Sequence, residues 1–308
     1  MDAMIVGSAL AAALRRSLFP GTGAVGLRLR LWDEAETGVS APDRLPGDPF
    51  PDRNASGERF ILEPGGRYGR YSSPDFEVHL DRARDRAVGW IRAEAALEYW
   101  HRARPLRTLF TSWLSGRGGT ILHAAMVAFG DYGVALPAKS HSGKSTCAAA
   151  CLAAGMDVLG DETLAIEERD GARLGHGLHS AIKLRRQGID AHGELATRLH
   201  SIGPGWPDDL LGYLQELHPG RLRPSAPLRA IAFPRLSSAR GTTHERVSAA
   251  HALRLLSGCL LTVGPADLAE AFDAAASICR HVPAYVLNVG TDPAGIPTAL
   301  RALSESTR

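Results

Sequence analysis

A ten-residue segment at positions 137–146 restricts the fold of this chain more than any other feature. It reads PAKSHSGKST, follows an apolar, strand-like stretch and precedes a run of small residues that favour helix. A turn between a strand and a helix directs backbone N–H groups toward one point, where the positive end of the helix dipole also favours an anion. The order strand, turn and helix therefore predicts a phosphate-binding loop in an α/β domain.

The segment matches the pattern G-x-x-x-x-G-K-[ST] at its end but not at its start. Gly143, Lys144 and Ser145 fit, whereas Ala138 replaces the first glycine, which is acceptable only if that residue needs no positive φ. We expect Lys144 to reach the β/γ-phosphate oxygens and Ser145 to ligate Mg²⁺. The alternative is a turn that merely caps a helix. The residues assigned to nucleotide binding are Ala138, Lys139, Ser140, His141, Ser142, Gly143, Lys144, Ser145 and Thr146.

The flanking residues predict the elements that such a loop requires. Residues 120–129 are almost continuously apolar, as in a strand buried on both faces, and the glycines of residues 130–133 predict a tight turn. Residues 134–136 then predict a second strand that leads into the loop. After the loop, residues 146–154 predict a helix that ends at Gly155.

An acidic pair follows the next predicted strand, residues 156–160. Asp161 and Glu162 come at the end of this strand, 17 positions after Lys144. One carboxylate can hold Mg²⁺ or support its ligands, and the other can accept a proton from an attacking hydroxyl. The alternative is a surface acidic turn, a description that suits the acidic hairpin predicted at residues 167–171.

Residues 122–166 resemble the HPr kinase/phosphorylase family. That family has a histidine on the strand before the loop, a G-K-S/T loop, one short helix and a paired acidic motif. The resemblance places His123 at the histidine position, Asp161 at the proposed general base and Glu162 at a second aspartate. A weaker likeness extends over residues 106–303. The sequence also resembles HPr kinase-like proteins of bacterial gene clusters, including lasso-peptide kinases, which phosphorylate a serine at the C-terminus of a precursor peptide.

The chain departs from the family pattern in two places. Ala138 and His141 replace loop glycines, and the R-G-L-G-I element is missing, which in the family carries a metal-ligating glutamate and is linked to phosphorolysis. These departures weigh against phosphorolysis and against HPr as the substrate. The nearest segment, residues 181–188, is a basic, strand-like run that could present Lys183 or Arg185 to the phosphates. A basic edge strand is an equal alternative.

The N-terminal part predicts a smaller β-rich domain over residues 1–104. Residues 25–32 alternate between apolar and other side chains, as in a half-buried strand, and residues 39–57 are rich in Pro, Asp and Gly, which predicts a long loop. This domain could bind the partner of the reaction by adding a strand to its sheet. Further elements expected here are strands over residues 60–62 and 76–80 and a helical stretch within residues 90–102.

Residues 105–308 predict an α/β domain of the HPr kinase type, with the phosphate loop at its centre. It begins with a helix from Pro105 to Gly116, whose apolar side chains form one stripe. Further along the chain, we expect Pro234 to break a strand. The other expected elements are a short helix over residues 208–217, a strand over 228–233, helices over 249–261 and 265–280, and a strand over 284–289.

Composition adds limits on partners and location. A net charge of +2 is too small to indicate nucleic acid, and no window has the roughly 18 apolar residues of a membrane span. The apolar residues 5–14 lack a basic flank before them, and Arg15 and Arg16 follow, so we expect an ordinary N-terminal element and a cytoplasmic protein. The four cysteines form no C-x-x-C pair, and Cys147 and Cys151 share a helix face as buried thiols would.

These features predict a kinase that uses ATP and Mg²⁺. Lys144 would neutralise charge on the transferred group, Ser145 and Glu162 would hold Mg²⁺, and Asp161 would accept the proton of the acceptor hydroxyl. His123 would hydrogen-bond Asp161 or the phosphate, or would be a satisfied core histidine. The resemblance implies a serine acceptor on a peptide or small protein, such as a lasso-type precursor. A small-molecule kinase and a nucleotide-dependent regulatory ATPase are the alternatives, and the oligomeric state stays open.

Overall fold

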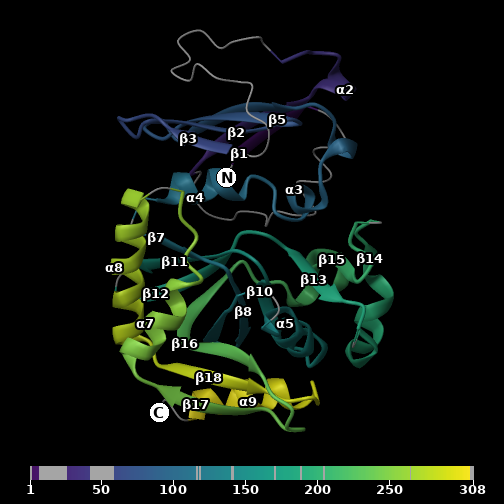
Figure 1. Cartoon of the computed structure of the whole chain (residues 1–308), viewed down its shortest axis with the longest axis vertical. Helices are drawn as coiled ribbons and strands as arrows, with labels where there is room; N and C mark the ends of the chain where they lie inside the picture. Colours follow the sequence, from purple (N-terminus) through teal and green to yellow (C-terminus); the bar gives the residue numbers. More distant parts are fainter. Residues whose placement is uncertain are drawn as a thin grey trace. The chain divides into compact units, whose positions relative to one another are not determined.

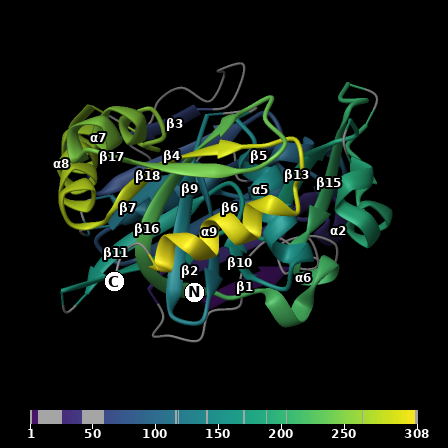
Figure 2. The same ribbon diagram turned by 90° about the horizontal axis from the view of Figure 1, so that it is seen from below.

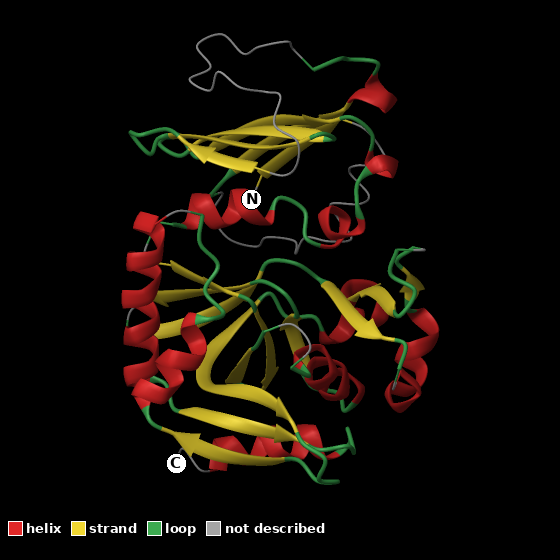
Figure 3. Ribbon diagram, viewed as in Figure 1, coloured by secondary structure: helices red, strands yellow, loops and turns green. Residues whose placement is uncertain are grey.

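A computed structural model describes most of the chain, and the described residues fall into two compact units, Met1–Trp113 and Leu114–Arg308 (Figures 1 and 3). Most of the loop expected over residues 39–57 and most of the N-terminal element expected over residues 5–14 lie outside the described residues. The described ranges are 2–6, 26–41, 59–115, 117, 119–139, 142–169, 171–187, 189–203, 205–263 and 265–305.

The first unit contains a six-stranded sheet in the order β1-β2-β6-β5-β4-β3. Strand β2 runs parallel to β1 and β6, and the remaining neighbours are antiparallel. The strands expected near β2, β3 and β5 are confirmed, whereas β4 and β6 were not predicted because glycine, serine and arginine interrupt their apolar pattern. The strands are β1 (Asp2–Val6), β2 (Arg28–Asp33), β3 (Arg59–Leu62), β4 (Tyr68–Ser73), β5 (Phe76–Asp81) and β6 (Arg86–Ile91).

Alternating residues bury one face of this sheet. Leu29 and Leu31 of β2 and Val78 and Leu80 of β5 are almost fully buried, as the period of two along a strand requires. Helix α4 (Arg107–Leu114) begins two residues later than expected, because Leu106 has a φ of 56°. The other helices of this unit are α2 (Glu34–Thr37), η1 (Glu94–Ala96) and α3 (Tyr99–Ala103), the last within the expected helical stretch.

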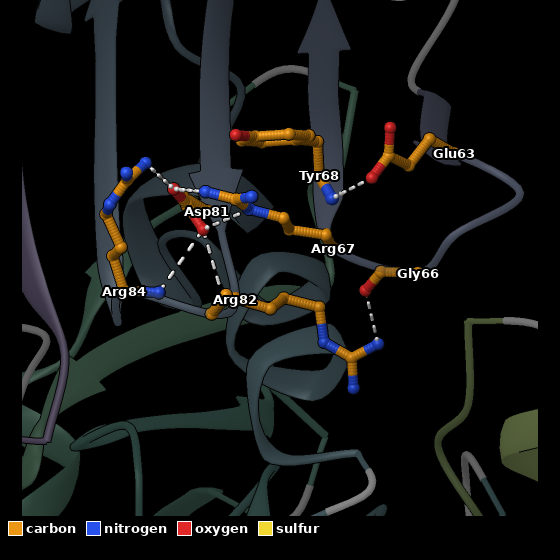
Figure 4. Close-up of polar contacts among 8 residues, drawn as sticks. Glu63, Gly66, Arg67, Tyr68, Asp81, Arg82 and Arg84 are labelled. Atoms are coloured by element: carbon orange, nitrogen blue, oxygen red, sulfur yellow. Dashed lines mark hydrogen bonds and ion pairs between the residues drawn. The ribbon is translucent and has the colours of Figure 1, made fainter.

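Asp81, at the end of β5, accepts hydrogen bonds from several donors (Figure 4). Its carboxylate accepts bonds from the guanidinium groups of Arg67, at 3.4 Å, and Arg84, at 3.1 Å, and from the backbone N–H of Ala83. Burial would raise the pKa of Asp81, but the bonds from Arg67 and Arg84 lower it below its ordinary value. Asp81 therefore favours the folded state only while it is ionised.

Asp81→Asn should lower the thermal stability of the first unit modestly at pH 7, because it removes the charge that both arginines share. The pKa of Asp81 is lower in the folded than in the unfolded protein. The stabilisation is therefore complete above the ordinary aspartate pKa, and it is lost as the pH falls through the pKa of the folded protein. Tryptophan fluorescence can follow the unfolding, since four of the five tryptophans lie in this unit. The difference should shrink in high salt. Asp75→Asn, in the β4–β5 turn, is the control, and an equal effect of both variants would contradict the assignment.

The second unit is built on a nine-stranded sheet in which β16 is the junction. Strand β16 pairs antiparallel with β12 and parallel with β9 and β18. The nine strands are β7 (Gly119–Leu122), β8 (Ala124–Phe129), β9 (Tyr132–Pro137), β10 (Asp157–Gly160), β11 (Leu164–Arg169), β12 (Ala172–Gly177), β16 (Ser225–Leu236), β17 (Thr243–Val247) and β18 (Ala284–Val289).

A smaller sheet in the order β13-β15-β14 completes the strands of this unit. Its members are β13 (Ala181–Arg185), β14 (His200–Ser201) and β15 (Asp209–Tyr213), with the short helices η2 (Ile189–Arg198), α6 (Leu214–Leu217) and η3 (Pro219–Arg221) beside them in the chain.

Helices cover both faces of the large sheet. Helices α5 (Lys144–Ala153) and α9 (Gly295–Glu305) pack in one apolar cluster, and α7 (Ala249–Ser257) and α8 (Pro265–His281) pack in another. Successive residues of β8 and β9 alternate between the two clusters. Figure 2 shows α7 and α8 side by side. The unit is therefore an α/β layered domain, as expected. Within the described ranges, no helix has the length and apolar character that a membrane crossing requires.

The expected strand over residues 120–129 is wrong in one respect, because it divides at His123. Strand β7 pairs with β11, whereas β8 pairs with β9 and β10. The His123 backbone bonds elsewhere: its N–H donates to the Cys259 carbonyl at 2.7 Å, and its carbonyl accepts from the Ala138 N–H at 3.4 Å. The hairpins at residues 130–133 and 167–171 and the helix end at Gly155, with a φ of 74°, are confirmed.

Two further expectations are wrong. Strand β16 continues through Pro234, because there it pairs only with β18 and the missing N–H lies on the side that has no ladder partner. The helix expected over residues 208–217 is mostly β15, which pairs with β13 along its whole length, and only Leu214–Leu217 is helical. Gly212 permits this pairing, since a Cβ there would lie 2.5 Å from Leu199 Cδ2. Helix α9 was not predicted.

Candidate phosphate-binding and acidic site

The predicted phosphate loop connects β9 to α5. Gly143 precedes the helix with a φ of 92°, and a Cβ there would lie 2.9 Å from Leu236 Cδ2, so the position requires glycine. Ala138 is not among the described residues with positive φ, which meets the condition for alanine in place of the first glycine. Ser140 and His141 lie outside the described residues.

The other loop residues surround the start of α5. Lys139 is exposed, and the Ser142 hydroxyl donates to its carbonyl at 2.8 Å. Ser145 and Thr146 are half-buried in the first turn of the helix. The backbone N–H groups of this turn have no partners within the helix, which is the general basis of anion binding at a helix N-terminus.

Lys144 lies against the acidic pair. Its side chain is 5% exposed, and its Nζ is 2.8 Å from Asp161 Oδ1 and 3.3 Å from Glu162 Oε1; it also donates to the Asp161 carbonyl. Burial would lower the pKa of Lys144, but the two carboxylates outweigh burial and raise it. The lysine therefore stays charged, and the first residue of α5 is tied to the end of β10.

Asp161 is fully buried, and one of its oxygens has no partner. Oδ1 accepts from Lys144, whereas Oδ2 has no hydrogen bond in the described part of the chain. Burial raises the pKa of Asp161, and Glu162 raises it further, against the lowering effects of Lys144 and the Ser145 hydroxyl. A buried acceptor without a donor costs about 1–3 kcal/mol. A ligand that supplies a proton or a cation to Oδ2 would remove this cost.

His123 contacts the second acid rather than the first. Its Nε2 lies 3.3 Å from Glu162 Oε2, while the other oxygen of Glu162 faces Lys144. The histidine is held by its backbone bonds to Cys259 and Ala138, so it links the phosphate loop to the end of α7. The expectation that His123 hydrogen-bonds Asp161 is wrong, because its ring contacts Glu162 instead. A contact between His123 and the phosphate stays a prediction.

The oxygen atoms of this site suit Mg²⁺ bound together with phosphates. The described residues contain no cluster of three or more His, Cys, Asp or Glu side chains that could hold a metal alone. Magnesium usually takes one or two carboxylates and completes its shell with water and substrate phosphates. The Ser145 hydroxyl and the Glu162 carboxylate fit such a shell, and the unpaired Oδ2 of Asp161 stays available to accept a proton.

The basic side chains of strand β13 show no contact with the phosphate loop among the described residues. Lys183 Nζ pairs with Asp209 Oδ2 at 3.1 Å and lies 5.7 Å from the centre of the Trp206 ring, and Arg185 is exposed. Strand β13 forms an edge of its sheet, as in the alternative of a basic edge strand. A phosphate contact by Lys183 or Arg185 stays a prediction.

The four cysteines are buried free thiols. Burial raises the pKa of each, to about 12 at Cys151 and about 11 at Cys279. Cys147 and Cys151 pack in the apolar cluster under α5, so their shared helix face is core, as expected.

Two neighbours of the site were not predicted. Leu236, at the end of β16, contacts the loop at Gly143, and Cys259, just after α7, accepts the His123 N–H. Both come from distant parts of the chain, and neither carries a motif, so no local pattern could have indicated them.

No protein-family model matches the chain, and no curated protein matches it. Among solved structures, the Hpr(Ser) kinase/phosphatase from Coxiella burnetii is similar over 60% of this chain and 97% of that chain, with 12% sequence identity and a TM-score of 0.35. A TM-score of this size establishes no common fold, so the function proposed below depends on the residues of the site.

Lys144→Ala should destabilise the second unit by about 3–5 kcal/mol, because it leaves two carboxylates without their cation. Adding Asp161→Asn should restore much of this loss, since it removes one of those charges. Urea unfolding followed by circular dichroism measures both. Lys183→Ala breaks a pair that is more exposed and should cost less. A double variant no more stable than Lys144→Ala would contradict the pairing.

Proposed function

We propose that this protein is an ATP- and Mg²⁺-dependent kinase that phosphorylates a serine hydroxyl. One observation carries the proposal: a strand–loop–helix segment of phosphate-loop sequence places its lysine on an acidic pair whose first member, Asp161, is buried, and one oxygen of Asp161 has no partner among the described residues. A structural ion pair alone leaves this oxygen unexplained, whereas a proton acceptor for an attacking hydroxyl needs it free.

Each residue of the site would have a separate role in the reaction. The N–H groups at the start of α5 and the Lys144 ammonium would bind the β- and γ-phosphates. The acceptor oxygen would attack the γ-phosphorus, the bond to the bridging β–γ oxygen would break to release ADP, and Asp161 Oδ2 would take the hydroxyl proton. Mg²⁺, held by Ser145 and Glu162, would neutralise charge on the phosphates. His123 would orient Glu162 through the contact at Nε2.

The acceptor is proposed from the resemblance in sequence. We infer a serine of a peptide or small protein, with the C-terminal serine of a lasso-type precursor as the first candidate, and we assign binding of this partner to the N-terminal β-rich unit. A small-molecule hydroxyl would use the same residues, so the assay must include both kinds of acceptor. A regulatory ATPase would need no acceptor at all.

The transfer assay uses γ-labelled ATP, Mg²⁺ and peptides that end in serine, with free serine and sugars in parallel. Label should appear on a peptide, and Asp161→Asn should reduce the rate about 10²- to 10⁴-fold, as loss of a general base does. Lys144→Ala should abolish transfer. Asp131→Asn, in the exposed β8–β9 turn, is the matched control and should leave the rate unchanged. Lys144-dependent release of free phosphate without any labelled acceptor would refute the kinase assignment and favour an ATPase.

The pH dependence of kcat/KM tests the role of Asp161 separately. Because burial raises the pKa of this group, activity should fall on the acid side at a higher pH than an ordinary aspartate would give. Glu162 contributes to the rise, so Glu162→Gln should move the acid limb to lower pH even if it also slows the reaction. An acid limb that Glu162→Gln leaves in place would exclude Asp161 as the titrating base.

A further inference from the structure

We propose that the side chain of Lys139 is a second phosphate-binding cation, which contacts the terminal phosphoryl group of the nucleotide from the α7 side of the loop. This inference rests on the proposed function and adds a residue to it. It assigns a role to a side chain that the phosphate-loop pattern leaves unspecified, since the position is one of the variable ones between the first small residue and Gly143.

The charge balance of the site requires another cation. Lys144 contributes one positive charge, and Asp161 and Glu162 contribute two negative charges, so these three side chains carry a net charge of −1 when all are ionised. The charge of Lys144 is thus already shared with two carboxylates before any phosphate binds. A bound triphosphate brings several more negative charges close to the same carboxylates. One Mg²⁺ offsets part of this charge, and a further cation near the terminal phosphate would offset more.

Lys139 is the available cation of the loop. It is one of only three lysines in the chain, and its side chain is exposed. In the part of the chain that the structure describes, Lys144 and Lys183 both form ion pairs, whereas no ion pair or hydrogen bond is formed by the Lys139 ammonium. A charged side chain that is tied to no acid can turn toward a phosphate without first breaking a contact.

The stem of Lys139 lies over the end of α7. A Cβ on Gly258, the residue that follows this helix, would lie 3.1 Å from Lys139 Cε and 3.8 Å from its Nζ. The absence of a side chain at Gly258 therefore leaves room for the lysine. The carbonyl end of a helix also favours a cation weakly, which holds the ammonium near the loop while the nucleotide is absent.

This position is connected to the acidic pair through Cys259 and His123. Lys139 and Lys144 both lower the pKa of the Cys259 thiol, which burial raises, so both ammonium groups act on the same sulfur. The Cys259 carbonyl holds His123, whose ring contacts Glu162. Under this proposal, the phosphoryl group that Asp161 would serve lies within reach of both lysines.

The test compares the binding of ATP·Mg²⁺ and ADP·Mg²⁺ by isothermal titration calorimetry on the full chain. Lys139→Met should weaken ATP about tenfold, which corresponds to the loss of one charged contact, and should change ADP much less. Lys139→Arg should keep most of the affinity for ATP. Lys139 is exposed, so the fold should be unaffected, and circular dichroism checks this.

Arg254→Ala is the matched control, because Arg254 is an exposed cation on α7 and its removal changes the net charge equally. Equal losses of ATP affinity in Lys139→Met and Arg254→Ala would show that only the net charge of the protein matters, and would overturn the proposal. Equal weakening of ATP and ADP, or no weakening of either, would also overturn it while leaving the kinase assignment intact. A wild-type chain that binds neither nucleotide would remove the proposed function and this inference together.

Discussion

The buried contact between Lys144 and the two carboxylates is the interaction on which the second unit depends. Charged groups without solvent are costly unless they are paired, so helix α5 can pack on the sheet only where its first residue meets the end of β10. This requirement fixes the helix relative to β8 and β10. The pairing is also unequal, because one ammonium contacts two acids, and Asp161 Oδ2 has no donor in the part of the chain that the structure describes.

The sheet explains how the other residues reach this contact. Strands β9, β16 and β18 run parallel, so the phosphate loop and the end of β16 lie at the same edge, where open α/β sheets commonly bind ligands. The interruption at His123 turns the chain out of the ladder and places an imidazole beside Glu162. The site therefore combines a strand end, a helix start and a strand break. At each of these places the regular backbone hydrogen bonding stops, which leaves groups that a ligand could contact.

Local pattern predicted most elements near the site and failed where long-range pairing decided the outcome. The hairpin before the loop, the helix after it and the acidic strand end all follow from glycine positions and apolar runs. Pro234 was expected to break a strand, but proline is tolerated where one side of a strand has no partner. Residues 208–217 contain leucines that suit either state, and pairing with β13 selected the strand over residues 209–213. The six-stranded N-terminal sheet was recognised only in part, because glycine and arginine obscure the alternation in β4 and β6.

The sequence by itself determined which residues could form a phosphate site, because G-K-S between a strand and a helix, followed by an acidic pair, has few other uses. It also predicted that Cys147 and Cys151 are buried on one helix face, whereas the requirement for glycine at position 143 follows from its φ of 92° in the structure. Only the tertiary structure decided that Lys144 is already paired, that His123 contacts Glu162 rather than Asp161, and that Lys139 has no acidic partner among the described residues. These are questions of distance and burial between residues far apart in the chain. Electrostatic energies depend on such distances, and no local pattern specifies them.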